Sequence, residues 1–169
     1  MIDTYHLSAG VLVRGLTNLK AQLEKAEDHA AAHGIGEAAL LGATLAAQGH
    51  AGGSASDLHG FTLTAQVHWA AEGARLAIAQ LLGAPSTPAA NDAKSFAELH
   101  AHLDATIAYL RGAAPSDLEA GLARTIVIEH PRGATSASGS RFLLALAIPH
   151  FFYHLTAAYS ILRNQGVAL

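Results

Sequence analysis

The chain has 169 residues, with 10 lysines and arginines, 13 aspartates and glutamates, and no cysteine. This length suggests a single domain spanning residues 1–169, with one substantial core. The absence of cysteine excludes a thiolate metal site, a cysteine nucleophile and a disulfide framework. The basic residues are scattered, so no nucleic-acid partner is expected. The first residues do not resemble a signal peptide and no long apolar run is present, so we expect a soluble cytoplasmic protein without a membrane span.

Helical periodicity dominates the first half of the chain. Residues 4–33 are predicted to form one long amphipathic helix ending at Gly34, because apolar residues recur at steps of three and four: Leu12, Leu16, Leu19, Leu23, Ala26 and Ala30. A short helix is expected over residues 37–47, and the glycines and serines of residues 49–56 predict a loop. A second long helix is predicted from about residue 61 to residue 82, with Gly83 as its end.

Capping patterns mark the helices that follow. The two prolines of residues 84–92 predict a linker. Ser95 and Glu98 then form a capping-box pattern that begins a third long helix, which is predicted to continue to Leu110. Ser116 and Glu119 repeat this spacing and predict one more short helix.

The last part of the chain changes character before it becomes helical again. Three β-branched residues at 126–128, followed by turn-type sequence at 131–133, predict a small β-hairpin over about residues 124–138. The final helix is predicted from about residue 140 to residue 164, with a kink at Pro149 because proline lacks a backbone N–H. Four long amphipathic helices predict an all-α protein, a four-helix bundle with a small β-hairpin inserted before the last helix.

The unusual feature of the composition is its 11 histidines. His150 and His154 are four residues apart in the apolar stripe of the last helix, a spacing that places both rings on one side. Such a pair is a two-ligand clamp for zinc, nickel, copper or iron. In the second long helix, His68 and Glu72 lie on one side with Arg75, and His68 could supply a third ligand.

Simpler explanations compete with a metal site. A buried histidine usually needs only a hydrogen-bond partner for each ring nitrogen. The chain also contains a second pair with the same spacing, His29 and His33, at the end of the first long helix, where a cation complements the helix dipole. That pair is expected to be solvated and serves as an internal control.

The sequence "IPHFFYHLTAAYSILRNQGV" resembles the C-terminal signature of a bacterial protein family of unknown function within the DinB/YfiT-like metalloenzyme superfamily. "VRGLTNLKAQLEKAEDHAAAHGI" and "QVHWAAEGARLA" are similar to it as well, so the resemblance covers most of the chain. The resemblance implies a four-helix bundle and a metal site formed by His68, His150 and His154. The narrower family often has Asn and Gln where this chain has His150 and His68, so it does not generally keep the three histidines.

The chemistry implied by the resemblance is a metal-dependent transferase or hydrolase acting on a small molecule. The expected cofactor is a divalent metal ion, zinc or nickel, and the substrate could include a low-molecular-weight thiol, which the cysteine-free chain cannot itself supply. Glu72 is the candidate base and Arg75 could bind a carboxylate. Two alternatives stay open: a non-enzymatic metal or small-ligand binding protein, and a structural bundle with satisfied core histidines. A homodimer is expected from the abundance of alanine and leucine on the helices.

Overall fold

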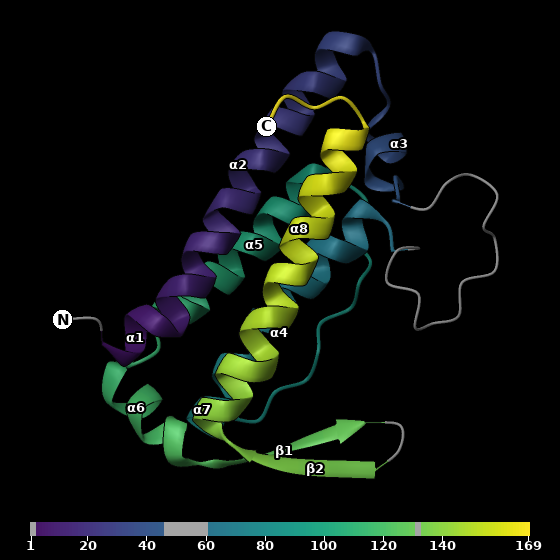
Figure 1. The fold of residues 1–169 in the computed structure, drawn as a ribbon. Coiled ribbons are helices and arrows are strands. Elements are labelled where there is room, and N and C mark those ends of the chain that lie inside the picture. The colour runs from purple at the N-terminus through teal and green to yellow at the C-terminus, as the bar shows by residue number, and fades with distance from the viewer. Residues whose placement is uncertain (1–2, 46–60, 131–132) are drawn as a thin grey trace.

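The computed structural model describes residues 3–45, 61–130 and 133–169. These residues are mostly helical, with one two-stranded antiparallel hairpin directly before the last helical segment (Figure 1). The hairpin insertion is therefore confirmed. The loop predicted at residues 49–56 and the turn residues 131–132 lie outside the described residues.

The first predicted helix is interrupted, which corrects the prediction of one continuous helix over residues 4–33. Helix α1 spans Thr4–Leu7 and helix α2 spans Ala9–His33. The break falls at Ser8, whose hydroxyl donates a hydrogen bond to the carbonyl oxygen of Thr4 at 2.6 Å. A serine side chain that bonds the preceding turn competes with the helical backbone, and apolar periodicity alone does not reveal this. Helix α2 ends at Gly34 in the left-handed conformation, as predicted.

The next helices follow the predicted order, but the helix predicted over residues 37–47 is much shorter than expected, because Gly42 ends it. Helix α3 spans Glu37–Leu41, α4 spans Leu63–Leu82 and α5 spans Phe96–Arg111. The hydroxyl of Ser95 accepts a hydrogen bond from the backbone N–H of Glu98, which confirms the predicted cap.

The short helix after α5 does not begin at the predicted cap. Helix α6 spans Pro115–Ala123, and no side chain caps its first turn. It begins one residue before Ser116 because Pro115 has its backbone angle already fixed near the helical value and needs no N–H partner there. The prediction of a capping box at Ser116 and Glu119 was therefore wrong.

The hairpin consists of strand β1, Thr125–His130, and strand β2, Gly133–Ser138. Ile126 of β1 is buried and packs with Ala77 of α4 and with Phe142. The chain then enters helix α7, Gly139–Phe142, a π-helical turn, Leu143–Ala147, and helix α8, Ile148–Asn164. A kink was predicted at Pro149; the irregular backbone is instead the π-helical turn that ends two residues before it, where the missing proline N–H disturbs the regular hydrogen-bond pattern.

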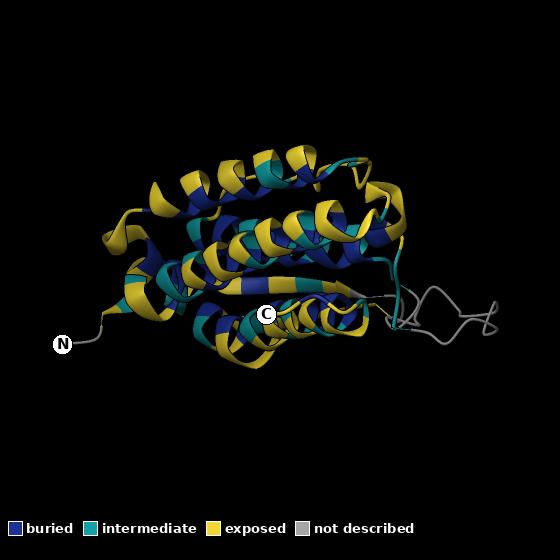
Figure 2. Cartoon of the chain, turned by 90° about the horizontal axis from the view of Figure 1, so that it is seen from above, coloured by how far each residue is buried: buried dark blue, intermediate teal, exposed yellow. Residues whose placement is uncertain are grey.

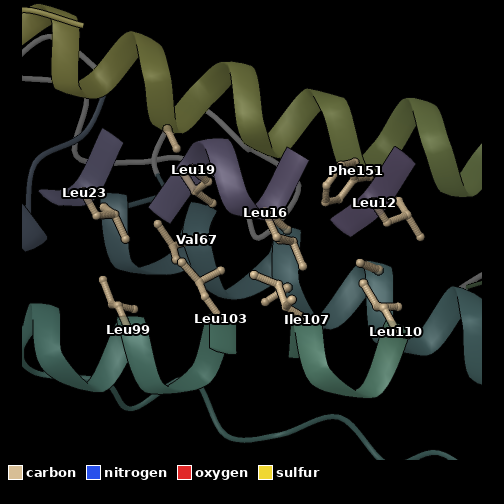
Figure 3. Packing of buried hydrophobic residues seen from close by; sticks show 14 of the residues in the cluster. Leu12, Leu16, Leu19, Leu23, Val67, Leu99, Leu103, Ile107, Leu110 and Phe151 are labelled. Atoms are coloured by element: carbon tan, nitrogen blue, oxygen red, sulfur yellow. The ribbon is translucent and has the colours of Figure 1, made fainter. Parts of the chain in front are cut away.

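The core lies between the four longest described helices, α2, α4, α5 and α8. In Figure 3, leucines of α2 point toward leucines and Ile107 of α5, with Val67 of α4 between them and Phe151 of α8 beside Leu12. All six residues of the predicted apolar stripe on α2 are buried. Helices α2, α5 and α8 present an exposed side outward and a buried side inward, whereas α4 has no exposed residue (Figure 2).

One helical segment of the described chain, residues 139–164, is long and apolar enough to cross a membrane by length and composition. This is a weak indication, because the core helix of a soluble protein passes the same test. Helix α8 has one side buried against α4 and α2, and the other side is exposed. The absence of a membrane span stays a prediction.

Candidate functional site

The paired histidines of α8 meet through their ring nitrogens. The Nε2 atoms of His150 and His154 lie 3.2 Å apart, and Nδ1 of His154 lies 2.7 Å from the side-chain oxygen of Gln66. An amide oxygen can only accept a hydrogen bond. Nδ1 of His154 therefore carries the proton, and this N–H donates a hydrogen bond to the side-chain oxygen of Gln66. Nε2 of His154 therefore has a free lone pair, and His150 donates its N–H to it in the metal-free protein.

Both rings of this pair favour the neutral form, although His154 is buried and His150 is exposed on one side. Removal from water lowers the pKa of His154 to about 4, and the neighbouring His150 adds to the shift. Burial also lowers the pKa of His150. A metal ion binds imidazole only in its neutral form, so both rings are in the required protonation state at neutral pH.

The separation of the two nitrogens fits two ligands of one ion. Two nitrogens bound to a tetrahedral zinc at about 2.0–2.1 Å are roughly 3.3 Å apart. The 3.2 Å between the His150 and His154 nitrogens matches this value. The hydrogen bond to Gln66 fixes the orientation of His154, which is the usual arrangement around a metal-binding histidine.

The control pair has the same sequence spacing but a different geometry. The rings of His29 and His33 lie 4.2 Å apart between centroids and are tilted by 33°. The rings of His150 and His154 are nearly perpendicular, at 80°. In the control pair, Nδ1 of His33 is bonded to the carbonyl oxygen of His29. Spacing alone therefore does not set the relative orientation of the two rings, and in α8 the hydrogen bond to Gln66 holds the ring of His154.

His68 lies in a different environment from this pair. It is buried, and its ring stacks on His102 of α5 with 5.4 Å between centroids and 14° between planes. Gln66 and His68 are two residues apart, which turns their side chains about 200° around the helix axis. Since Gln66 faces α8, His68 faces α5. Burial lowers the pKa of His68, and the charge of His102 adds to this effect.

His68 and His102 form one wall of a polar cavity of about 330 Å³. Asp92, Lys94 and Glu98 also line this cavity, on the side of the linker and the first turn of α5. Burial lowers the pKa of His102. Its Nε2 atom lies 3.7 Å from a carboxylate oxygen of Glu72, which is beyond hydrogen-bond distance.

Glu72 and Arg75, the predicted base and carboxylate binder, are bonded to each other and to the linker before α5. The Glu72 carboxylate accepts from Nη2 of Arg75 at 2.8 Å and from the backbone N–H of Ala89 at 3.0 Å. Nη2 of Arg75 also donates to the carbonyl oxygen of Thr87 at 2.6 Å. These contacts hold the linker against α4.

The charge state of Glu72 follows from the same contacts. Burial opposes its ionisation, but the hydrogen bonds from Arg75 and Ala89 outweigh burial and lower the pKa of the carboxyl. A carboxylate with a lowered pKa is a weak base, and both of its oxygens are already engaged. In this conformation, Glu72 is better suited to pinning the linker than to proton transfer.

The structure thus brings together two of the three predicted metal ligands. Within residues 3–45, 61–130 and 133–169, no group of three or more histidine, cysteine, aspartate or glutamate side chains is arranged to hold a metal ion. His150 and His154 contact Gln66, whereas His68 contacts His102. A three-histidine site stays a prediction.

Two residues of these sites were not singled out from the sequence. Gln66 is 88 residues from His154 along the chain, and His102 lies on α5, whereas its partner His68 lies on α4. A signal for Gln66 did exist, because it is a polar residue on the apolar side of α4 that also carries Ala70, Gly73 and Ala77. A buried amide in such a position needs a polar partner.

Comparison with known proteins agrees with this fold. A crystal structure of a DinB family member protein from Shewanella denitrificans superposes with a TM-score of 0.81 and is 30% identical, covering 98% of this chain and 87% of that one. The chain therefore has the DinB-like fold. Residues 4–169 match the model of the family described as "Domain of unknown function (DUF1993)", and the chain belongs to this family. No protein with a curated description matches it.

Proposed function

We propose that this protein is a metal-dependent enzyme built on a DinB-like four-helix bundle, in which His150 and His154 bind one divalent ion, zinc or nickel. The observation that carries the proposal is the 3.2 Å separation of their Nε2 atoms, with His154 oriented by Gln66. The resemblance of the C-terminal sequence to the DinB/YfiT-like superfamily supports the same assignment.

The residues around the pair have distinct parts in this proposal. His154 and His150 hold the ion, and Gln66 keeps the proton of His154 on Nδ1. When bound, the ion would activate water or a thiol for a transferase or hydrolase reaction on a small molecule. The thiol would come from a cosubstrate, because the chain has no cysteine.

His68 has a testable role at the same centre. To act as a third ligand, the His68 ring would have to move away from the His102 ring on which it stacks. Whether it does so is tested separately from metal binding by His150 and His154. The substitution His68→Ala would weaken zinc binding at least tenfold if His68 is a ligand, since ligand loss costs about 1.4 kcal/mol or more. An unchanged affinity would assign His68 to the polar cavity instead.

Metal content is the direct test of the proposal. Protein purified without a polyhistidine tag is stripped with EDTA and titrated with zinc and with nickel by calorimetry. The proposal expects one ion per chain, with binding lost in His154→Ala. Turnover assays with low-molecular-weight thiols on the metal-loaded protein then separate an enzyme from a non-enzymatic metal binder.

One observation favours a second candidate, a structural role for the same histidines. Both ring nitrogens of His154 have partners without a metal, Gln66 and His150. This is what a histidine needs to lie stably in a core. In that case no ion would bind, and His154→Ala would reduce stability alone.

The proposal also includes a location in the bacterial cytoplasm, as a soluble protein.

We further propose that the protein is a homodimer. Two aromatic side chains of α8, Phe152 and Tyr159, are exposed at 44% and 41%. They lie beside a surface hollow between α8 and α2 and would be covered by a second copy. Light scattering on the parent and on Phe152→Asp tests this, with a dimer in the first and a monomer in the second.

A further inference from the structure

A second and larger cavity, of about 570 Å³, opens where the hairpin meets α4 and the beginning of α8. Its walls are mainly apolar, with side chains of α4, of β1, of α7 and of the π-helical turn: Trp69, Leu76, Ala77, Val127, Phe142 and Leu146. The contact of Ile126 with Ala77 and Phe142 holds the hairpin in place as one wall. The hairpin therefore builds a cavity that the helices alone would not form.

His150 is the polar group at the α8 side of this cavity. Its Nε2 atom faces His154, so Nδ1 is the nitrogen left for another partner. Gly73 of α4 keeps the space next to that atom open, because a Cβ added at Gly73 would meet only Nδ1 of His150, at 3.6 Å. The cavity thus reaches the metal-binding pair proposed above through a gap left by a glycine.

The size and lining of the cavity indicate what kind of molecule it accepts. A volume of this size is typical of small-molecule sites and too small for a helix or a strand of a partner. Val127 and Leu146 are exposed at 55% and 41% and would be covered by an apolar ligand. The Glu129 carboxylate also lines the cavity and disfavours an anionic ligand.

We propose that this cavity binds a neutral small molecule with an alkyl or aryl body and a single hydroxyl or thiol head that faces His150. Since a cavity of about 150 Å³ holds a benzene ring, the body has about 8 to 20 non-hydrogen atoms. The inference rests on the proposed function in one respect: the head group on Nδ1 and the proposed ion on Nε2 would share the ring of His150. It names the substrate class for that site.

The test uses 1-octanol as the probe and Trp69 as the reporter, because Trp69 is the single tryptophan of the chain and lines the cavity. EDTA-treated full-length protein is titrated while tryptophan emission is recorded. The expected result is a saturable change in emission. Ethanol, which has the same head without the apolar body, gives no saturable change at equal concentration.

Two variants locate the binding. Gly73→Leu fills the space beside His150 and abolishes the saturable response; its folding is checked by circular dichroism. Leu146→Gln and Leu144→Gln are a matched pair, since both leucines are exposed in the π-helical turn and only Leu146 lines the cavity. Leu146→Gln weakens octanol binding about tenfold, as the loss of one or two buried methylene groups implies. Leu144→Gln leaves it unchanged.

The outcomes separate this inference from the proposed function. A linear response in the parent, or an unchanged saturable response in Gly73→Leu, overturns the cavity assignment. Saturable octanol binding by His154→Ala, a variant expected to lose zinc, shows that the cavity acts independently of the ion. If zinc fails to bind the parent while octanol binds, the metal proposal falls and the cavity assignment stands.

Discussion

Acidification should destabilise this protein through His154, and the size of the effect follows from its burial. The unfolded chain binds a proton on this ring near pH 6.5, whereas burial lowers the pKa of the folded ring to about 4. Between these values the unfolded state binds more protons, so the stability contributed by the neutral ring is present above pH 6.5 and is lost as the pH falls toward 4. The loss is about 2 kcal/mol from pH 7 to pH 5 and about 3 kcal/mol by pH 4.

The assay compares the parent with His154→Gln, which cannot titrate but can still bond Gln66. Urea unfolding is followed by circular dichroism at pH 7 and pH 5 in EDTA. The free energy of unfolding of the parent should fall by about 2 kcal/mol more than that of the variant. His29→Ala is the control and should show the same pH dependence as the parent. Equal losses in the parent and in His154→Gln would refute the assignment of a buried neutral ring at this position.

Three further substitutions test other parts of the account by urea unfolding or proteolysis. Gly73→Ala should stabilise the protein by about 0.8–1 kcal/mol, because α4 gains helix propensity and the new Cβ has room; a loss of stability would contradict the open space beside His150. Gly15→Ala should cost about 1–3 kcal/mol, since its Cβ would lie 2.6 Å from a ring carbon of Phe151; no cost would mean that α2 and α8 are not so closely packed. Glu72→Gln should speed protease cleavage within residues 84–94, because it weakens the contact with Arg75 and Ala89, and unchanged cleavage would rule out the pinning role.

The sequence predicted the helices because their signals are local. The apolar stripe of α2, the glycines that end α2 and α4, and the Ser95 cap all lie within a few residues of the features they determine. The break at Ser8 was not predicted. The Ser8 hydroxyl donates a hydrogen bond to the backbone of the preceding turn, while the apolar pattern used for the prediction continues past it. The start of helix α6 at Pro115 was not predicted either. Proline at the first helical position has its backbone angle already fixed near the helical value and needs no capping side chain.

The candidate site was only partly predictable, since it depends on which helix faces meet. The spacing of His150 and His154 is a property of one helix, and the structure keeps the two rings together. The direction of His68 depends on the placement of α4 between α8 and α5, which no single helix specifies. Its partner His102 and the partner of His154, Gln66, come from other helices for the same reason.

The central claim is that His150 and His154 form a metal-binding pair. The most direct measurement is the unfolding free energy of EDTA-treated protein with and without zinc at pH 7.5 and pH 5.5, for the parent, His154→Ala and His29→Ala. At a hundredfold excess over its dissociation constant, zinc should stabilise the parent and His29→Ala by about 2.7 kcal/mol at pH 7.5, and by nearly as much at pH 5.5, because the low pKa of His154 keeps its ring neutral there. His154→Ala should show no such gain. Equal zinc-induced gains in the parent and in His154→Ala would show that the ion binds elsewhere and that the two histidines are part of the core packing.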